Sequence, residues 1–403
     1  MTAGQSSEFG GPSTDEAATV LERTLAYARR REYTGWDYGD GMSSRFRRAL
    51  PFDNRWVNLA FQETAKRAPI NVRPLLLVER RRNFMGAALF VLANLRAADL
   101  FGDDAYRAEA RRLADWLVAH RTEGYSGYCG GHNHDLQGLR KRTPGVVGTT
   151  FAVEALLAAG DAFDERYAEV ALTAADFVFE DLGYEERGDR ATIDYKPDEP
   201  GAYVTINAVA LGARLLVDLY DYFGDRRCLD GARKLLNYVA DLQTDAGGWY
   251  YREPPEATHL SMDTHHNGFV IECFQRYRAV VDDRYDETLD RALAFFRDEL
   301  FEVDGAPNFD EDSAYPRDVH ASVQGVLAFT KAGDLEFARR ILGWTLARLY
   351  AGDGRFYVRQ HRLYTQRHVL MRWCQAWMAH ALAEYLTARE RGGDHVALPE
   401  RTP

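Results

Sequence analysis

Two polar motifs of the same form lie 55 residues apart in the C-terminal half of the chain. They read Asp-Thr-His-His-Asn at 263–267 and Asp-Val-His-Ala-Ser at 318–322, and each opens an apolar helical segment. An Asp or a His at the N-terminal end of a helix can face a pocket, where it can transfer protons or hold sugar hydroxyls. The predicted catalytic residues are therefore Asp263, His265, Asp318 and His320.

The same motifs also have a structural interpretation. An Asp at the start of a helix caps its free N–H groups, and a His can fill a polar hole between neighbouring helices. Asp alone suffices as a cap, so the recurrence of His together with Asp favours a functional site.

A second cluster of polar residues lies in the Gly-rich segment around His132-Asn-His134-Asp135. Three potential metal ligands occur there in four residues, but the sequence contexts typical of zinc sites are absent. Substrate hydrogen bonding is the preferred role for these side chains. We expect no bound metal and no cofactor.

Arginine side chains concentrate in the segments that connect the helices, although the whole chain has a net charge of −11. A guanidinium group pairs well with carboxylate, sulfate or phosphate. Arginines gathered around one binding site would therefore select an anionic ligand. Some of these arginines could instead balance nearby acids such as Glu253 and Asp310. The predicted partner is an anionic carbohydrate.

Aromatic residues are also frequent in these segments, and both sugar rings and terpenes pack against such side chains. The chain lacks the Asp-x-Asp-Asp motif of terpene chemistry, and the connecting segments that should surround the binding site are rich in polar groups. A sugar is therefore preferred. The predicted substrate-binding residues are Trp36, Asp37, His132, His134, Asp135, Tyr203, Asn207, Tyr251, Arg252, Asn267, Tyr315, Arg317, Arg362, Arg372, Trp373 and Gln375.

The elements that would position these residues are helices of two kinds, which alternate six times. Amphipathic helices, apolar on one face only, should form an outer layer, whereas helices that are small and apolar nearly all round should be enclosed. The outer helices are predicted at 15–31, 104–120, 164–182, 226–243, 285–300 and 335–350. The inner helices are predicted at 82–99, 146–159, 205–223, 264–281, 319–332 and 368–388.

Six such hairpins predict an all-α (α/α)6 barrel with long functional loops at one end, because the outer-to-inner connections are long and the reverse ones short. We expect a single domain over residues 15–389, with a disordered tail at 1–14 and a polar tail at 390–403. The unusually long first connection, 32–81, is a candidate lid over the mouth.

Composition narrows the class of protein further. The acidic net charge argues against a nucleic-acid partner. The sequence contains neither an apolar signal core near its start nor a run of about 18 apolar residues, so we expect no membrane insertion. Four scattered cysteines fit reduced thiols. The expected location is cytoplasmic, and the oligomeric state is left open.

Three stretches resemble known families. The Gln-Thr-Asp-Ala-Gly-Gly-Trp stretch at 243–249 resembles the Gln-Trp repeat of squalene cyclase and prenyltransferase toroids, although it occurs only once. Arg-Trp-Cys-Gln-Ala-Trp at 372–377 resembles a stretch of six-hairpin glycosidases, notably the unsaturated glucuronyl hydrolases. Residues 200–388 more broadly resemble an uncharacterised toroid family linked to polysaccharide biosynthesis. These resemblances imply glycan chemistry, in cell-surface polysaccharide or glycoprotein glycan metabolism.

Two chemistries suit the residue types. Glycoside hydrolysis needs two carboxyl groups, for which Asp263 and Asp318 are the natural pair, with Asp37 or Asp135 as substitutes. Uronate elimination or C5-epimerisation needs a base and groups that neutralise the sugar carboxylate. Candidate bases are His265, His320 and Tyr315, and candidate carboxylate-binding groups are Arg317, Arg372, Asn267 and Gln375.

Fold analogy slightly favours a glycoside hydrolase. We therefore expect the chain to be an enzyme that acts on a uronate- or sulfate-bearing glycan. The alternatives are a non-enzymatic glycan-binding or scaffold toroid and a terpene cyclase- or prenyltransferase-like enzyme. An apolar cavity would indicate the last of these.

Overall fold

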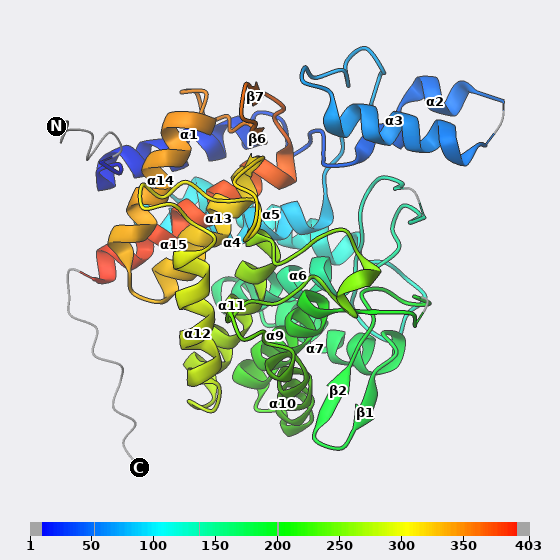
Figure 1. Ribbon diagram of the computed structural model, residues 1–403, viewed down its shortest axis with the longest axis vertical. Helices are drawn as coiled ribbons and strands as arrows, with labels where there is room; N and C mark the ends of the chain where they lie inside the picture. Colours follow the sequence, from blue (N-terminus) through cyan, green and yellow to red (C-terminus); the bar gives the residue numbers. More distant parts are fainter. Residues whose placement is uncertain (1–9, 52, 137, 200, 393–403) are drawn as a thin grey trace.

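The computed structural model describes residues 10–51, 53–136, 138–199 and 201–392, and these are mostly helical (Figure 1). The predicted all-α class is confirmed. Most of the two expected tails, residues 1–9 and 393–403, lies outside the described residues. Helix α1 (Thr14–Arg29) begins at an N-cap where the Ser13 hydroxyl accepts from the backbone N–H of Glu16.

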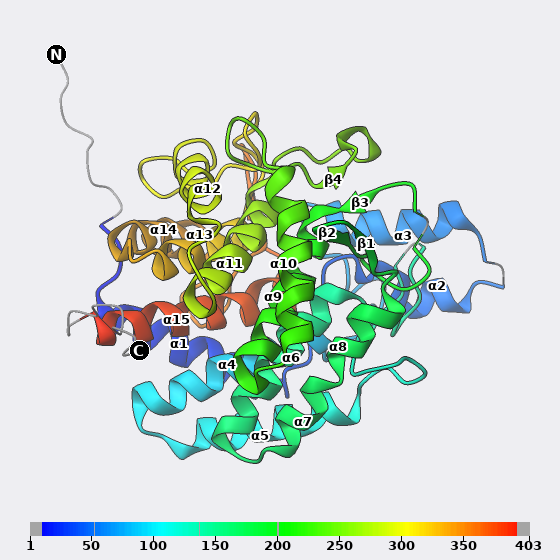
Figure 2. The same cartoon turned by 90° about the horizontal axis from the view of Figure 1, so that it is seen from below.

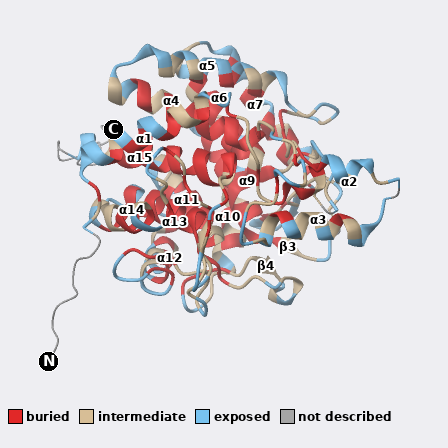
Figure 3. Cartoon of the chain, turned by 90° about the horizontal axis from the view of Figure 1, so that it is seen from above, coloured by how far each residue is buried: buried red, intermediate tan, exposed pale blue. Residues whose placement is uncertain are grey.

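The inner layer consists of helices whose positions are mostly buried on every side, as Figure 3 shows in red. Small apolar residues allow this close packing. The predicted bounds agree with the observed ones to within a few residues, except at 368–388, where a π-helical turn precedes the α-helix and the α-helix begins only at Trp377. The inner helices are α4 (Phe84–Phe101), α6 (Val146–Ala162), α9 (Ile206–Phe223), α11 (Thr264–Val280), α13 (Val319–Lys331) and α15 (Trp377–Arg391).

The inner helices form a closed ring. Each packs on the next in chain order, and α15 packs back on α4, which brings the last hairpin against the first. This closure confirms the (α/α)6 barrel. Because every inner helix is preceded by a long connection, all six N-terminal ends open on the same mouth.

The outer layer consists of amphipathic helices, each packed on an inner partner. The third predicted outer helix, 164–182, is divided into three pieces, because the chain turns at Thr173, whose hydroxyl donates to the carbonyl of Val170 (2.8 Å). The outer elements are α1, α5 (Asp104–Ala119), α7 (Arg166–Leu172), α8 (Ala174–Asp176), the π-helical turn η2 (Phe177–Asp181), α10 (Arg226–Asp241), α12 (Asp286–Asp298) and α14 (Leu335–Leu349).

The long connections carry short strands at the mouth. Three small antiparallel sheets form, with orders β1-β2, β3-β4 and β5-β6-β7. The strands are β1 (Glu185–Arg187), β2 (Arg190–Thr192), β3 (Val204–Thr205), β4 (Arg252–Glu253), β5 (Arg317–Asp318), β6 (Arg359–Gln360) and β7 (Thr365–Gln366). Strands β3 and β5 lead directly into α9 and α13, and a π-helical turn, η4 (Met371–Ala376), leads into α15.

The first long connection forms an excursion from the barrel. It contains the short 3-10 helix η1 (Asp40–Ser43), α2 (Arg45–Ala49) and α3 (Arg55–Arg67), and it projects from the body beside the mouth (Figures 1 and 2). Its shape differs from a lid laid across the mouth. It forms one wall instead, with α3 alongside the opening.

One described helix, α4, has the length and mean hydropathy that a membrane span needs, but 72% of that window is buried inside the protein. The position of α4 in the core of the barrel therefore accounts for its high hydropathy.

Arg214 forms the centre of a buried charge network in the middle of the barrel. Its guanidinium lies 2.6 Å from the Glu154 carboxylate and 3.6 Å from that of Glu272, and it is 3% exposed. Although burial alone would lower the pKa of Arg214, these carboxylates outweigh it and raise the pKa. The network ties α6, α9 and α11 together below the mouth.

We expect Arg214→Ala to lower the free energy of unfolding by about 3–5 kcal/mol, because it leaves the buried Glu272 and the partly buried Glu154 carboxylates without this cation. Urea unfolding followed by circular dichroism measures this change. Arg187→Ala, at an exposed position in β1, is the control and should change the free energy by less than about 0.5 kcal/mol. A loss below about 1 kcal/mol in Arg214→Ala would contradict a structural role for the network.

Candidate active site

A cavity of about 790 Å³ opens at the mouth of the barrel. This volume lies in the range of small-molecule sites and accommodates more than one sugar ring. The wall combines apolar side chains, such as Phe84 and Phe269, with histidine, arginine, lysine and amide groups. A polyene would meet many polar groups here, so the lining argues against terpene chemistry.

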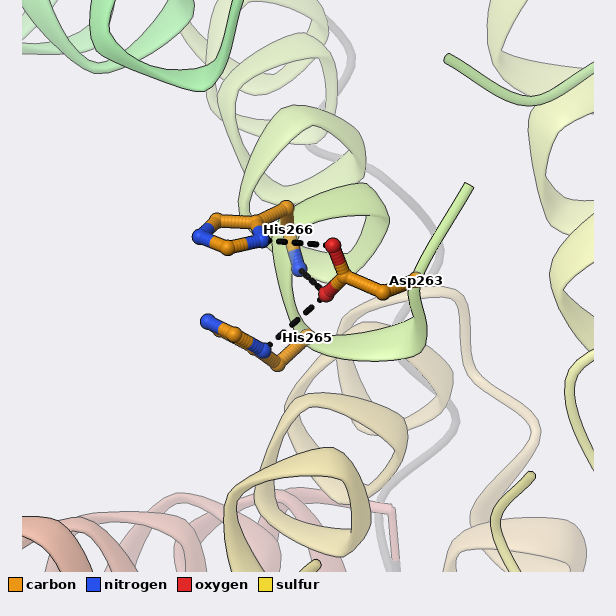
Figure 4. Close-up of side chains that lie close together, drawn as sticks. All are labelled: Asp263, His265 and His266. Atoms are coloured by element: carbon orange, nitrogen blue, oxygen red, sulfur yellow. Dashed lines mark hydrogen bonds and ion pairs between the residues drawn. The ribbon is translucent and has the colours of Figure 1, made fainter. Parts of the chain in front are cut away.

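One carboxylate at the start of α11 orients two imidazole rings that face the cavity (Figure 4). Asp263 caps the helix, and its two oxygens lie 3.0 Å from Nδ1 of His265 and 2.7 Å from Nδ1 of His266. The ring centroids of the two histidines are 3.7 Å apart. Both rings extend from the carboxylate with Nε2 at their far end.

The charge of Asp263 decides the tautomer of both rings. Burial alone would raise the pKa of Asp263, but the neighbouring His266 and His265 outweigh it and hold the pKa well below its usual range. An ionised carboxylate only accepts hydrogen bonds, so both Nδ1 atoms carry hydrogen. Each ring directs its Nε2 away from the carboxylate (Figure 4), and in the neutral form this nitrogen can act as a general base.

His320, at the start of α13, presents a third imidazole to the cavity. Its ring is 1% exposed, lies 5.1 Å from that of His265 in a stacked arrangement, and has no hydrogen-bond partner at Nδ1 or Nε2. Burial, followed by the charges of His265 and Arg372, keeps the pKa of His320 well below 6.5. A buried polar side chain without a partner facing a cavity indicates a place where a ligand supplies the partner.

Asp318 is fully engaged by protein groups. Its Oδ1 accepts from the backbone N–H of His320 and from the indole of Trp373, both at 2.8 Å. Its Oδ2 accepts from two nitrogens of Arg359 at 2.7 and 3.1 Å. Both oxygens of Asp318 are therefore occupied, and the residue positions Arg359 and Trp373 at the cavity wall.

A second buried pair supports the wall behind the cavity. Both nitrogens of Arg372 that face Asp37 lie 2.9 Å from its carboxylate, which also accepts from the amide of Asn83 at 2.7 Å. Although burial alone would raise the pKa of Asp37, the Arg372 guanidinium outweighs it and lowers the pKa. Asp37 thus fixes Arg372, which lines the cavity.

Nine of the predicted site residues line the cavity. They come from five separate connections, so only closure of the barrel assembles them. They are Asp263, His265, Asp318, His320, His132, Asn207, Tyr251, Arg372 and Trp373.

Eleven predicted substrate-binding residues lie outside the lining of this cavity as the described residues define it. Several hold the wall rather than the ligand: the amide of Asn267 bonds both backbone groups of Trp249, and that of Gln375 bonds both backbone groups of Phe356. The eleven are Trp36, Asp37, His134, Asp135, Tyr203, Arg252, Asn267, Tyr315, Arg317, Arg362 and Gln375.

Two of these residues make contacts that account for their places outside the lining. Arg252 stacks on the ring of Tyr203, 3.7 Å from its centroid, and donates to the carbonyl of Ala257. Arg317 lies near Glu302, at 3.5 Å. Loop residues can face either side of a thin wall, and residue type does not decide which.

The sequence prediction missed residues that complete the lining. His266 is the clearest, because a side chain two residues after the first of a helix reaches back towards the N-cap, and this geometry could have been anticipated. Lys66, on α3, and Lys196 also line the cavity, and neither has a carboxylate within 4.0 Å among the residues that the structure describes. The other missed polar residues of the lining include Tyr38, Asn83, Tyr195, His259, Arg359, His361 and Gln366.

The site could also hold a metal ion at one place. Asp263, His265 and His266 each offer a ligand atom, and these atoms lie within 4.8 Å of one another. The cluster at 132–135, which the sequence offered as possible metal ligands, is not assembled in this way. The ring centroids of His132 and His134 are 5.5 Å apart, and Asp135 accepts a hydrogen bond from the backbone N–H of Lys141.

The buried histidines predict a pH-dependent stability. Burial is the main cause that lowers the pKa of His368 and of His380 to about 4, below the unfolded value of about 6.5. The unfolded chain therefore binds more protons between these values, and stability should fall as the pH drops from about 6.5 to 4, by up to about 1.4 kcal/mol per pH unit and group. Urea unfolding at a series of pH values measures this slope.

Two variants separate this effect from general acid denaturation. His380→Gln should reduce the dependence of the free energy of unfolding on pH by the contribution of about one proton. His120→Gln, at an exposed position, should leave this dependence unchanged. Equal slopes in all three proteins would refute the assignment.

Comparison with known proteins supports the fold. No protein-family model and no curated protein matches the sequence. Among solved structures, an unsaturated glucuronyl hydrolase specific for heparin is similar with TM-score 0.62 and 13% identity, covering 94% of this chain and 98% of that one.

Two further structures represent other chemistries. A cellobiose 2-epimerase from Bacillus thermoamylovorans B4167 has TM-score 0.59 and 13% identity, over 76% of this chain and 88% of the other. A polysaccharide lyase has TM-score 0.57 and 11% identity, over 96% and 99%. The similar structures are thus carbohydrate-active hydrolases, epimerases and lyases, and this chain has the six-hairpin, glycosidase-like (α/α)6 toroid fold that they share.

Proposed function

We propose that this protein is a carbohydrate-active enzyme that moves a proton at a sugar carbon next to a carbonyl or carboxylate group, as in epimerisation or elimination. The observation that carries the proposal is the group of three histidine rings around His265, of which two are oriented by one buried carboxylate. His265 or His266 acts as the base through Nε2, and His320 supplies or accepts the second proton.

Hydrolysis is the competing chemistry, and the state of the carboxyl groups argues against it. A glycosidase needs a carboxylic acid that keeps its proton near neutral pH. Asp263 and Asp318 are the only carboxylates in the described lining, and the oxygens of each are occupied by histidine, arginine or indole groups of the protein, which leaves them unavailable to a glycosidic oxygen. The histidines are therefore better placed than the carboxyl groups to transfer protons.

An anionic group on the substrate is part of the proposal. Lys66 and Lys196 have no carboxylate partner in the described wall, so a carboxylate or sulfate on the sugar would neutralise them. Arg359 and Arg372 are already paired with Asp318 and Asp37, and they would add hydrogen bonds rather than net charge.

Solvent isotopes distinguish the chemistries. The protein would be incubated in D₂O with reducing disaccharides and with uronate-containing oligosaccharides, and the sugars analysed by NMR and mass spectrometry. Proton transfer predicts deuterium at the carbon next to the carbonyl or carboxylate, or an unsaturated uronate product. Release of reducing ends with ¹⁸O from labelled water, without carbon-bound deuterium, would establish hydrolysis instead. Binding without any turnover would indicate a glycan-binding toroid.

A further inference from the structure

The excursion between α1 and α4 has a charge opposite to that of the rest of the chain. Residues 45–82 contain ten Arg and Lys but only three Asp and Glu, a net charge of +7, whereas the whole chain carries −11. The remaining residues therefore carry −18. The catalytic histidines do not account for this segregation, because they lie on α11 and α13.

The same segment exposes large apolar side chains. A soluble surface rarely gathers such residues, and here they belong to the segment that projects from the body of the barrel (Figure 1). The exposed fractions are 53% for Phe46, 71% for Trp56, 70% for Ile70, 72% for Leu75 and 48% for Leu77.

The acids of the segment are already paired, and its Arg73 is buried against Asp40, so the exposed arginines carry the charge that a partner would meet. Asp53 lies 2.5 Å from Arg47, Glu63 pairs with Arg67, and Glu79 pairs with arginines at 45, 48 and 81. Arg55 and Arg80 are exposed and have no carboxylate partner among the described residues. Arg55 lies against the ring of Trp56, 5.8 Å from its centroid.

We propose that this excursion, residues 45–82, docks the protein peripherally on an anionic lipid bilayer. Bulky apolar side chains interspersed with arginine match the headgroup boundary, where apolar tips enter and guanidinium groups meet phosphate. Two-fold self-association through this patch would place two surfaces of charge +7 against each other, which is unfavourable.

The docking surface adjoins the cavity. Gln62, Lys66 and Arg67 line the cavity from α3, which also carries Trp56 at its exposed end. Docking would thus bring the mouth of the barrel to the bilayer surface. The docking proposal does not depend on the chemistry proposed for the histidines.

Vesicle co-sedimentation tests the proposal on the full chain. Binding is expected to vesicles of phosphatidylcholine mixed with phosphatidylglycerol at about 0.1 M salt, and it should be lost at about 1 M salt, where the Debye length falls to about 3 Å. The protein should bind only weakly to vesicles of phosphatidylcholine alone. Equal binding to both vesicle types, or no binding to either, would overturn the proposal.

Charge-reversal variants locate the surface. Arg45→Glu, Arg48→Glu and Arg55→Glu together should lower the partition coefficient roughly a hundredfold, because each arginine at an anionic bilayer contributes about fivefold. The control reverses Arg187, Arg190 and Arg278, which are exposed on other elements, and should retain most of the binding.

A second variant avoids disturbing the pairs with Glu79. Arg55→Glu with Trp56→Ala removes an arginine without a carboxylate partner and a 71% exposed ring, and it should weaken binding at least tenfold with unchanged circular dichroism. If these variants instead abolish a dimer seen by size exclusion while vesicle binding is absent, the surface is a protein interface and the proposal fails.

Discussion

His320→Gln is expected to lower kcat by about a thousandfold in the deuterium-exchange assay, with little change in substrate affinity. General acid–base groups typically contribute about 10²- to 10⁴-fold. Among the described residues, the side chain of His320 packs against Trp373 and Trp377 but makes no hydrogen bond, so Gln removes a proton carrier without breaking a hydrogen bond. Its backbone N–H, which binds Asp318, remains in place.

Three measurements make this prediction specific. His120→Gln, outside the cavity, should retain full activity and controls for the loss of a histidine as such. His320→Ala should recover part of its rate when imidazole is added, because the shortened side chain leaves room beside Trp373. A kcat within about fivefold of the wild type in His320→Gln would remove this residue from the chemistry.

Asp263→Asn is expected to lower kcat/KM by about 10³- to 10⁴-fold, by analogy with carboxylates that orient a catalytic imidazole. The amide has one accepting oxygen, whereas the carboxylate serves the Nδ1 atoms of His265 and His266 as well as a backbone N–H. One ring must then turn or change tautomer. The lost negative charge also no longer stabilises a protonated imidazole, so the acidic limb of the pH profile should move to lower pH.

The stability of this variant separates catalysis from folding. Asn is as good an N-cap as Asp, so the free energy of unfolding should change by less than about 1 kcal/mol despite the loss of activity. Asp103→Asn, at the exposed N-cap of α5, is the matched control and should change neither quantity. Retention of both rate and pH profile in Asp263→Asn would show that the carboxylate is only a cap.

The helices were predictable from the sequence because their signals are local. Enclosed helices such as 146–159 are apolar on all sides and outer helices on one side, and short Gly-Asp turns at 102–103, 224–225 and 333–334 end three of the hairpins. The caps were predictable for the same reason: Asp263 and Asp318 both accept from backbone N–H groups one turn into their helices, as their positions indicated.

The long connections were only partly predictable. Their composition indicated a polar mouth, and nine predicted residues do line the cavity. Residues such as Asn267 and Gln375 have the same chemical character but bond to the backbone of the wall instead. The difference depends on which side of a connection faces the barrel axis, and no local pattern records it.

By itself, the sequence determined the number and order of the hairpins, the caps and the polar character of the mouth, since these depend on neighbours a few residues apart. The tertiary structure alone decided the different roles of the two aspartates. Arg359 and Trp373 reach Asp318 from a distant connection and occupy its oxygens, whereas the side-chain oxygens of Asp263 meet histidines of its own helix. Contacts between segments far apart in the chain exist only after the barrel has closed, and they made one aspartate a support of the wall and left the other to orient two imidazole rings.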